Sequence, residues 1–229
     1  MAPTGRCGGM LVGVHMLVFD IGEFEEGIFF IRIRLRHKEH DFKFNLISVY
    51  GPAQADHKAN FLSEMVRVCS KDTIPMIIGG DFNIIRRPDE KNNANYNDKW
   101  PFVFNAVIDS LNLREINLLG RKYTWANNLP VQTFEKLDRV LVCMNFESKY
   151  THTTVQALLM EILDHTPLLF TTNEPSMTYQ PQFKFELGWL LRDSFCEMVC
   201  GVWQNTVAIG SPIERWHAKI RRLRQYLRG

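Results

Sequence analysis

The 229-residue chain is poor in several features that define whole classes of protein. Its five cysteines are an odd number and include no Cys-x-x-Cys pair, which argues against a disulfide framework or a structural zinc site and favours a reducing compartment. The apolar segment at residues 10–19 is too short to cross a bilayer, is interrupted by His15, and is followed by no convincing small-residue cleavage site. Internal repeats and low-complexity segments are absent. We therefore expect a soluble intracellular protein, nuclear or cytoplasmic, with no membrane partner.

The composition is that of a folded chain with an uneven charge. Hydrophobic residues make up 45% of the sequence, enough to bury the core of one large α/β domain with an appendage. The formal net charge is +2, but residues 211–229 contain six Lys or Arg and one Glu, so this tail carries +5 and residues 1–210 sum to −3. The body is therefore mildly acidic and the tail is basic.

Hydrophobic periodicity predicts a mixture of strands and single helices. Apolar runs bounded by turn residues predict strands at 8–19, 27–37, 42–52 and 74–80. Apolar residues at helical spacing predict helices over 56–70 and about 100–111. Residues 122–128 and 134–142 are predicted to form an antiparallel pair, and the runs at 153–160 and 166–172 flank a further loop. This order fits an α+β sandwich better than a doubly wound parallel sheet.

Two groups of potential metal ligands have simpler interpretations. His37 and His40 lie between the second and third predicted strands, where a solvated hairpin turn is favoured over a metal site. Cys196 and Cys200 lie four residues apart on a predicted helix, and we expect them to pack as small apolar side chains.

The stretch "IIGGDFNII" at residues 77–85 allows two interpretations. In one, Gly79 and Gly80 form a turn and Asp81 is a local cap, since Gly and Asp are common turn residues. In the other, Asp81 and Asn83 stand at the rim of a catalytic site. The stretch by itself does not decide between them.

Polar residues at several predicted strand ends favour the catalytic interpretation. The set comprises Tyr50 in "VYGP", Asp81 and Asn83 in "GGDFN", Asp138 in "KLDRVL", and Asp164 and His165 in "LDHTPLL". Each has an innocent explanation as a packing, ion-pairing or capping residue. Together they supply ligands for a hard cation, a base for water and a proton-bearing group, which metal-assisted phosphodiester hydrolysis requires.

In this order the motifs resemble the endonuclease/exonuclease/phosphatase superfamily, which includes DNase I and the abasic-site endonucleases. "RKYTW" at 121–125, followed by "FEKLDRVLV", is similar to the endonuclease domain of plant LINE-type retrotransposon polyproteins. The resemblance extends over nearly the whole chain and implies a four-layer α/β-sandwich. It implies an endonuclease domain at 1–175 and, at 176–229, a helical linker toward an absent reverse transcriptase region.

The resemblance implies a role for each residue that matches a motif. Asp81 would orient or deprotonate the attacking water, Asn83 would hold that water or the phosphate, and Tyr50 would contact the scissile phosphate of DNA. Inositol-lipid phosphatases belong to the same superfamily and are the alternative substrate class.

The remaining matched residues would stabilise the charge of the phosphate or bind the metal ion. His165 would stabilise the non-bridging phosphate oxygen, and Asp138 would fix its tautomer. Asp164 and Asp81 would face the metal, with Mg²⁺ the expected ion and Mn²⁺ the alternative.

The chain departs from the superfamily pattern in two ways. Leu163 stands where a serine is usual before the Asp-His pair. The pattern also opens with a strand–helix–strand unit that carries an asparagine and a metal-binding glutamate, and this unit lies upstream of the residues present. Glu23, Glu25 and Glu26 are expected to be solvated turn residues, not substitutes for that glutamate. Three hypotheses follow: an active metal-dependent nuclease, a degenerate domain that binds nucleic acid or a partner, and a truncated remnant without a selected role. For the chain as it stands, nuclease activity is expected to be weak or undetectable.

The basic tail has its own helix signals. Ser211, Pro212 and Glu214 have the spacing of a capping box with proline at the first helical position. Apolar residues then recur every three or four positions, and most of the Lys and Arg lie off that stripe. A packing helix with a solvated basic face is one interpretation, and contact with nucleic acid or with the absent polymerase region is the other.

Overall fold

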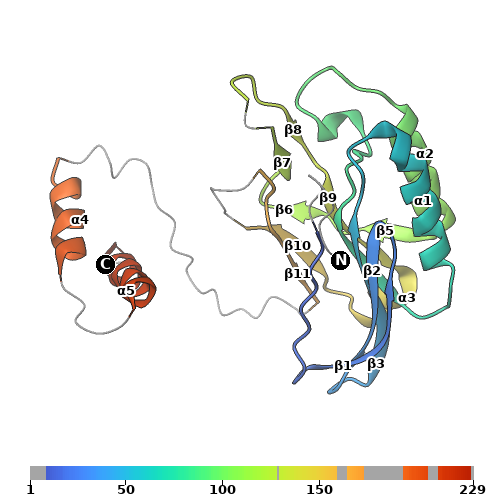
Figure 1. Ribbon diagram of the computed structural model, residues 1–229, viewed down its shortest axis with the longest axis horizontal. Coiled ribbons are helices and arrows are strands. Elements are labelled where there is room, and N and C mark those ends of the chain that lie inside the picture. Colours follow the sequence, from blue (N-terminus) through green and yellow to red (C-terminus); the bar gives the residue numbers. More distant parts are fainter. Residues whose placement is uncertain (1–8, 128, 159–163, 173–192, 206–210, 228–229) are drawn as a thin grey trace. The chain divides into compact units, whose positions relative to one another are not determined.

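The computed structural model describes residues 9–127, 129–158, 164–172, 193–205 and 211–227. The chain divides into two compact units, Met1–Glu174 and Pro175–Gly229, each of which is described by itself (Figure 1). In the first unit the elements are β1 (Phe19–Glu26), β2 (Phe30–His37), β3 (Phe42–Tyr50), α1 (Ala55–Cys69), β4 (Met76–Asp81), η1 (Pro88–Glu90), α2 (Lys99–Ser110), β5 (Leu113–Glu115), β6 (Leu118–Leu119), β7 (Trp125–Ala126), β8 (Phe134–Glu135), β9 (Asp138–Cys143), α3 (Met144–Lys149), β10 (Thr154–Ala157) and β11 (Leu168–Thr171).

A six-stranded sheet in the order β1-β2-β3-β4-β9-β5 forms the centre of the first unit. Within it only β3 and β4 are parallel, and the other neighbours are antiparallel. Two smaller sheets accompany it, β11-β10-β6 and the β7-β8 hairpin. The predicted α+β class is therefore confirmed, as are the hairpin pairing of the segments around residues 125 and 134 and the strands on both sides of the loop after residue 157.

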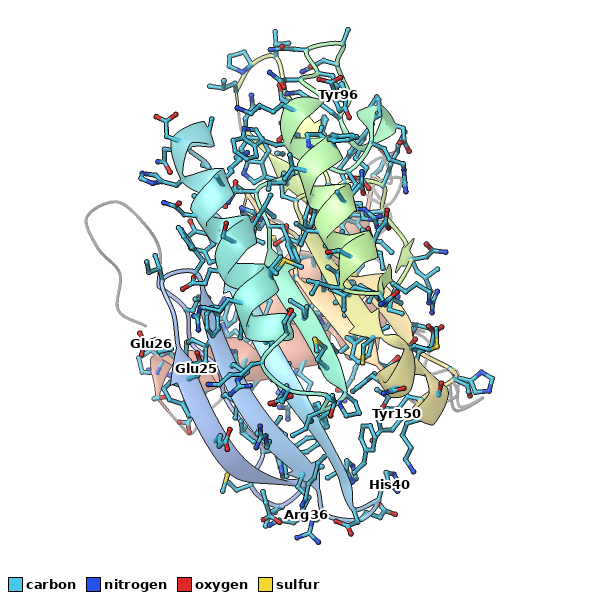
Figure 2. The ribbon with its side chains drawn as sticks, turned by 90° about the vertical axis from the view of Figure 1, so that its right-hand side faces the viewer. Glu25, Glu26, Arg36, His40, Tyr96 and Tyr150 are labelled. Atoms are coloured by element: carbon cyan, nitrogen blue, oxygen red, sulfur yellow. The ribbon has the colours of Figure 1, made fainter. Side chains whose placement is uncertain are left out.

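Helices α1 and α2 lie side by side over one face of this sheet (Figure 2). Each buries an apolar stripe, including Phe61 and Met65 of α1 and Phe104 of α2, against buried strand residues such as Ile78 and Leu141. Both helices begin and end within one residue of the sequence-based expectation. The helices thus fix one face of β4 and β9, so any site carried by these strands must use their ends or their other face.

The opposite face carries a second core. Period-2 alternation directs Ile31, Ile33 and Leu35 of β2 to this side, where they pack with Val140 and Val142 of β9. Residues of the small sheet, among them Val155 and Leu168, cover it. In the described part of the first unit, α1 and α2 therefore cover one face of the six-stranded sheet, and the small sheet β11-β10-β6 covers the other.

The N-terminal segment corrects one strand prediction. Residues 9–18 have no regular secondary structure, and β1 instead covers Phe19–Glu26. Met10, Val12 and Val14 do pack against the second core, while Leu11 is exposed, so the segment shows strand-like alternation of covered and exposed side chains although residues 9–18 belong to no strand. The apolar residues of the sequence correctly indicated that the segment has covered side chains. The position of the strand depends instead on the hydrogen-bonded pairing of β1 with β2.

The three glutamates after residue 22 are strand residues, not turn residues. All belong to β1, whose partner β2 presents the arginines that neutralise two of them. Glu25 bonds Lys71, just after α1, and Arg67 of α1, and it pairs with buried Arg32; these partners lower the pKa of its carboxyl. Glu25 therefore ties the edge strand to the helical layer.

The histidine-containing turn is a hairpin, as predicted. It joins β2 to β3, and the rings of His37 and His40 stack with centroids 4.4 Å apart. His40 and Arg36 lie at the opposite end of the unit from Tyr96 (Figure 2). The one group of metal-ligating side chains found in the described residues includes neither histidine.

The described residues of the second unit, 193–205 and 211–227, form the helices α4 (Phe195–Gln204) and α5 (Pro212–Leu227), which pack against each other. The expected capping box is present: the Ser211 backbone N–H donates to Glu214 Oε2 at 2.7 Å, and the Glu214 N–H donates to Ser211 Oγ at 3.3 Å. Cys196 and Cys200 are on α4 but are exposed, so the packing predicted for them is wrong. The buried side of α4 is formed by Phe195 and Val202 instead. Among the helices of the described ranges, none is both long and apolar enough to cross a membrane.

Candidate active site

Three predicted residues form a row across neighbouring strands. Tyr50 ends β3 and lies opposite Asp81, the last residue of β4, and Asp81 in turn lies opposite Asp138, the first residue of β9. Side chains two residues apart in a strand point to the same face. Asp138 is two residues from Val140 and Asp81 is four from Ile77, and both apolar residues belong to the second core, so the two carboxylates lie on the face away from the helices. Residues opposite each other in a ladder share a face, so the row gathers polar groups at one end of the sheet.

His165 completes this group from a distant part of the sequence. Its Nδ1 is 2.9 Å from Asp138 Oδ2, which is the hydrogen bond expected from the sequence, and its Nε2 is 3.8 Å from Asp81 Oδ2. Asp81, Asp138 and His165 each offer a ligand atom, and these atoms lie within 4.8 Å of one another. Asp138, expected only to orient the imidazole, thus also belongs to a potential metal site.

The two interpretations of "IIGGDFNII" turn out to be compatible in part. Gly79 and Gly80 lie within β4 and form no turn. Asp81 does accept a local bond from the Asn83 N–H at 2.8 Å, and its second oxygen accepts from Asn83 Nδ2 at 2.7 Å. The same carboxylate faces Asp138 and His165, so it has a capping role and a place in the cluster.

Two glycines permit this close arrangement. Gly80 has φ of +144°, and a Cβ there would lie 2.1 Å from the Val49 carbonyl oxygen. A Cβ on Gly51 would lie 2.3 Å from the Phe82 carbonyl oxygen. Side chains at either position would push apart the ends of β3 and β4 that carry Tyr50 and Asp81.

Burial and crowding set the protonation of the cluster. Burial, followed by the nearby charge of Asp138, raises the pKa of Asp81 to about 6. The hydrogen bond that His165 Nδ1 donates to the Asp138 carboxylate raises the pKa of His165 above its ordinary value. A carboxyl that titrates near neutral pH beside a protonatable imidazole is suited to proton transfer.

Thr124 holds the two halves of the cluster together. Its fully buried Oγ1 accepts the backbone N–H groups of Leu137 and Asp138, each at 3.0 Å. Its carbonyl oxygen accepts the Thr166 N–H at 2.7 Å. Thr124 in the "YTW" segment therefore positions both Asp138 at the start of β9 and the backbone next to His165. The sequence analysis did not predict this role for Thr124.

Arg139 fixes the site from the helical side of the sheet. Its side chain is fully buried, pairs with Glu90 and Glu115, and donates to the Ile84 carbonyl oxygen at 3.0 Å. Because Arg139 follows Asp138 directly, its side chain projects to the other face of β9. This buried network secures the loop that follows Asn83.

A cavity adjoins Asn83 and brings in residues that the sequence analysis missed. It measures about 250 Å³, and its polar and aromatic lining includes Lys58, Asn83, Lys91, Asn95, Tyr96, Asn97, Trp100 and Glu135. Lys58 Nζ donates to the Asn83 carbonyl oxygen at 2.7 Å, and burial lowers the pKa of its ammonium group. Lys58 lies three and four residues before the buried Phe61 and Leu62 of α1, so it continues the apolar stripe of the helix, and this spacing is the signal that separates it from a surface lysine.

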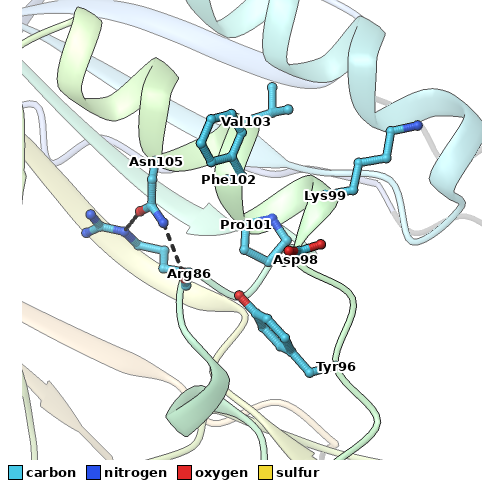
Figure 3. Close-up of a pocket in the computed structure, with 8 residues that line it drawn as sticks. All are labelled: Arg86, Tyr96, Asp98, Lys99, Pro101, Phe102, Val103 and Asn105. Carbon is cyan, nitrogen blue, oxygen red and sulfur yellow. Dashed lines mark hydrogen bonds between the residues drawn. The ribbon is translucent and has the colours of Figure 1, made fainter.

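A second cavity of about 470 Å³ shares Tyr96 and Pro101 with the first (Figure 3). One of its two cationic residues, Arg86, bonds the Asn105 side chain at 2.7 Å and Glu115 at 2.8 Å. No member of the Asp81–Asp138–His165 cluster lines either cavity. The first cavity is linked to the cluster through Asn83, which lines it and bonds Asp81.

The other predicted site residues, Tyr50 and Asp164, are not part of the group of potential metal ligands. Tyr50 is half-buried in the strand-end row. Asp164 is exposed, and its carboxylate lies outside the group of potential ligands, although its charge helps to raise the pKa of His165. Leu163, which replaces the usual serine, lies outside the described residues.

The donor set fits a divalent cation. Two carboxylates lie within reach of a common ion, and their mutual repulsion contributes to the raised pKa of Asp81. A cation between them would remove this repulsion, and carboxylate oxygen is the ligand that Mg²⁺ and Mn²⁺ share.

Comparisons with solved structures identify the fold. The endonuclease domain of TRAS1, a telomere-specific non-LTR retrotransposon, matches 69% of this chain with 70% of its own length, at 16% identity and a TM-score of 0.56. The human Nocturnin catalytic domain matches 68% of the chain over 61% of its own (17% identity, TM-score 0.39), and truncated Caenorhabditis elegans TDP2 matches 66% over 66% (12% identity, TM-score 0.41). No family model and no curated protein sequence matches.

The chain thus shares the DNase I-like fold that the sequence motifs suggested. Among the three structures described, the TRAS1 endonuclease domain is the one with a TM-score above 0.5. At 16% identity this likeness concerns the fold, and the chemistry must be argued from the residues.

Proposed function

We propose that the first unit is a divalent-metal-dependent phosphodiesterase that cleaves DNA, of the kind found in LINE-type retrotransposons. The observation that carries the proposal is the Asp81–Asp138–His165 cluster at the end of β4 and β9, with Asn83 bonded to it. The DNase I-like fold and the likeness to the TRAS1 endonuclease domain support this choice. On this proposal residues 176–229 are a linker toward a polymerase region.

Asp81 and Asn83 would prepare the attacking water. With a pKa of about 6, Asp81 is largely ionised at neutral pH and can accept a proton. Asn83 Nδ2 already donates to Asp81 and to the Gly51 carbonyl oxygen. Its Oδ1 can then accept a hydrogen bond from water, so of the two roles implied by the resemblance we favour the orientation of water.

His165 would stabilise the phosphate in the transition state. Asp138 bonds its Nδ1, which leaves Nε2 to donate to a non-bridging oxygen, and Tyr50 would contact the same phosphate. Asp81 and Asp138 would hold the cation, with Asp164 adding negative charge nearby. When bound, Mg²⁺ or Mn²⁺ supplies positive charge against the charge that develops on the phosphate.

The cavity beside Asn83 favours a nucleic-acid substrate. Lys58 and Lys91 provide cationic groups, although Lys91 also pairs with Glu135 at 2.7 Å. Trp100 and Tyr96 offer aromatic surface, and Asn95 and Asn97 offer amides. A pocket with these groups next to the cluster suits a nucleotide adjoining the cleaved phosphate.

The test is nicking of supercoiled plasmid by the purified chain with EDTA, MgCl₂ or MnCl₂. We expect slow, metal-dependent nicking that is lost in Asp81→Asn and in His165→Ala. Asp109→Asn, which removes an exposed carboxylate on α2, is the matched control and should nick like the wild type.

The outcomes separate the competing functions. Equal nicking by the wild type and by Asp81→Asn would contradict the proposal. Salt-dependent plasmid binding without nicking in either metal would favour the alternative, a catalytically degenerate domain that binds nucleic acid.

A further inference from the structure

Helix α5 carries one continuous row of cationic and aromatic side chains. Arg215, Lys219, Arg222 and Tyr226 follow one another at spacings of four, three and four residues, which places them along the same side of the helix. With a rise of 1.5 Å per residue the row is about 16 Å long. Glu214, the acidic residue of this helix, is held by the capping box with Ser211.

Arg215, Arg222 and Tyr226 of the row are exposed and Lys219 is half-buried, and the row has aromatic surface beside it. Trp216 is 53% exposed and Tyr226 is 60% exposed, an unusual degree for large rings. Lys219 Nζ lies over the Trp203 ring of α4, 5.4 Å from its centroid. Within the described residues no ion pair engages Arg215, Lys219 or Arg222.

The apolar side of α5 is partly covered. Ile220, Leu223 and Leu227 are half-buried and α5 packs against α4, whereas Ile213 and Trp216 at the start of the helix are exposed. An amphipathic helix that inserts into a lipid surface needs the whole of that side free. The exposed side chains along the rest of α5 are mainly cationic and aromatic, and they do not form a broad apolar face.

We propose that this row is a binding site for single-stranded nucleic acid, separate from the site on β4 and β9. A stacked strand carries a phosphate about every 3.4 Å, so the row spans roughly four or five phosphates. Cations in line neutralise the phosphates, and Tyr226 and Trp216 stack on bases, as in sequence-tolerant single-strand binders. Exposed rings have no such use on duplex DNA, whose bases are stacked in the helix. The inference does not depend on the proposed catalysis.

The test measures binding of the full chain to a fluorescein-labelled 15-nucleotide oligo-dT in EDTA, by anisotropy over a range of salt concentrations. Three row cations predict a slope of log affinity against log salt of about −2, from about −0.7 for each phosphate neutralised. Lys219→Gln with Arg222→Gln should reduce the slope to about −0.7 and weaken binding at least tenfold. Arg221→Gln with Arg224→Gln removes the same charge at the same three-residue spacing but lies off the row, and should change affinity about twofold.

A second pair of variants tests stacking. Tyr226→Ala should weaken binding about tenfold, since each stacked base contributes about 1–3 kcal/mol, whereas Tyr226→Phe should bind like the wild type. Equal losses in the two double variants would show general electrostatic attraction and overturn the site. Preference for duplex over oligo-dT, or binding to phosphatidylserine vesicles without binding to oligo-dT, would also overturn it.

Discussion

Glu115→Gln should destabilise the first unit in a way that depends on pH. The Glu115 carboxylate is 8% exposed and is bonded or paired with Arg86, Lys136 and Arg139. Desolvation by burial acts against the charged form, but the charge of Arg139 and then of Lys136 outweighs it, and the pKa falls from 4.5 to about 2. Each tenfold change in an ionisation constant is worth about 1.4 kcal/mol, so charged Glu115 stabilises the fold by about 3 kcal/mol at pH 7.

The sign of the pH dependence follows from the lowered pKa. A carboxyl whose pKa is lower in the folded state contributes its full stabilisation above the unfolded pKa, near 4.5, and loses it as the pH falls toward 2. Gln resembles the protonated acid at every pH. The difference in unfolding free energy between wild type and Glu115→Gln should therefore shrink from about 3 kcal/mol at pH 7 to about 2 kcal/mol at pH 3.5.

The measurement is urea unfolding at several pH values, followed by circular dichroism and tryptophan fluorescence. Leu141→Ala is the control, because this fully buried core residue of β9 has no titratable group. It should cost about 2–5 kcal/mol at every pH, and it identifies the transition of the first unit. A wild-type to Glu115→Gln difference below about 1 kcal/mol at pH 7, or one that does not change with pH, would refute the reasoning.

Three further predictions concern the site and the tail. Gly80→Ala should destabilise the first unit by about 3 kcal/mol or more because of its positive φ and the Val49 carbonyl oxygen, whereas Gly79→Ala, with its nearest neighbour at 3.7 Å, should be tolerated in the same urea assay. Thr124→Val keeps the shape of the side chain but leaves two backbone N–H groups without their acceptor, so unfolding free energy should fall by about 2 kcal/mol or more and metal-dependent nicking should fall with it. Amide hydrogen exchange should be faster at residues 211–227, where no residue of α5 is buried, than in β4 and β9, and equal protection would contradict a linker role for the tail.

The candidate site shows which steps could be followed from sequence. Strand ends were recognisable because apolar runs stop at Tyr50 and Asp81 and another begins just after Asp138, and a polar residue at the end of a buried strand has to face solvent or a partner. The hydrogen bond between His165 and Asp138 followed from the resemblance and is present at 2.9 Å. The position of Asp164 outside the ligand group did not follow, since adjacent residues in the chain need not point the same way.

The sequence-based predictions were wrong where contacts between strands or helices, not the local composition, decide the structure. Residues 9–18 have the apolar content of a strand, but a strand also needs a ladder of backbone hydrogen bonds to a neighbouring strand, and it is Phe19–Glu26 that forms such a ladder, with β2. The glutamates of β1 were predicted to be turn residues, but in the structure two of them, Glu23 and Glu25, form ion pairs with arginines of β2. Exposed Cys196 and Cys200 show that the apolar side of α4 is set by its contact with α5.

The sequence by itself determined the properties that depend on local periodicity: the α+β class, the helices, the hairpin at His37–His40, the capping box at Ser211 and the identity of the polar strand-end residues. These depend on spacing along the chain, which is visible in the letters. Only the tertiary structure decided how the strands are registered, and hence that Asp81 faces Asp138, that Thr124 links the start of β9 to the chain beside His165, and that Lys58 is half-buried beside Asn83. Register and burial depend on contacts between residues far apart in sequence, where many pairings have similar local preference and the packing of the whole core selects one.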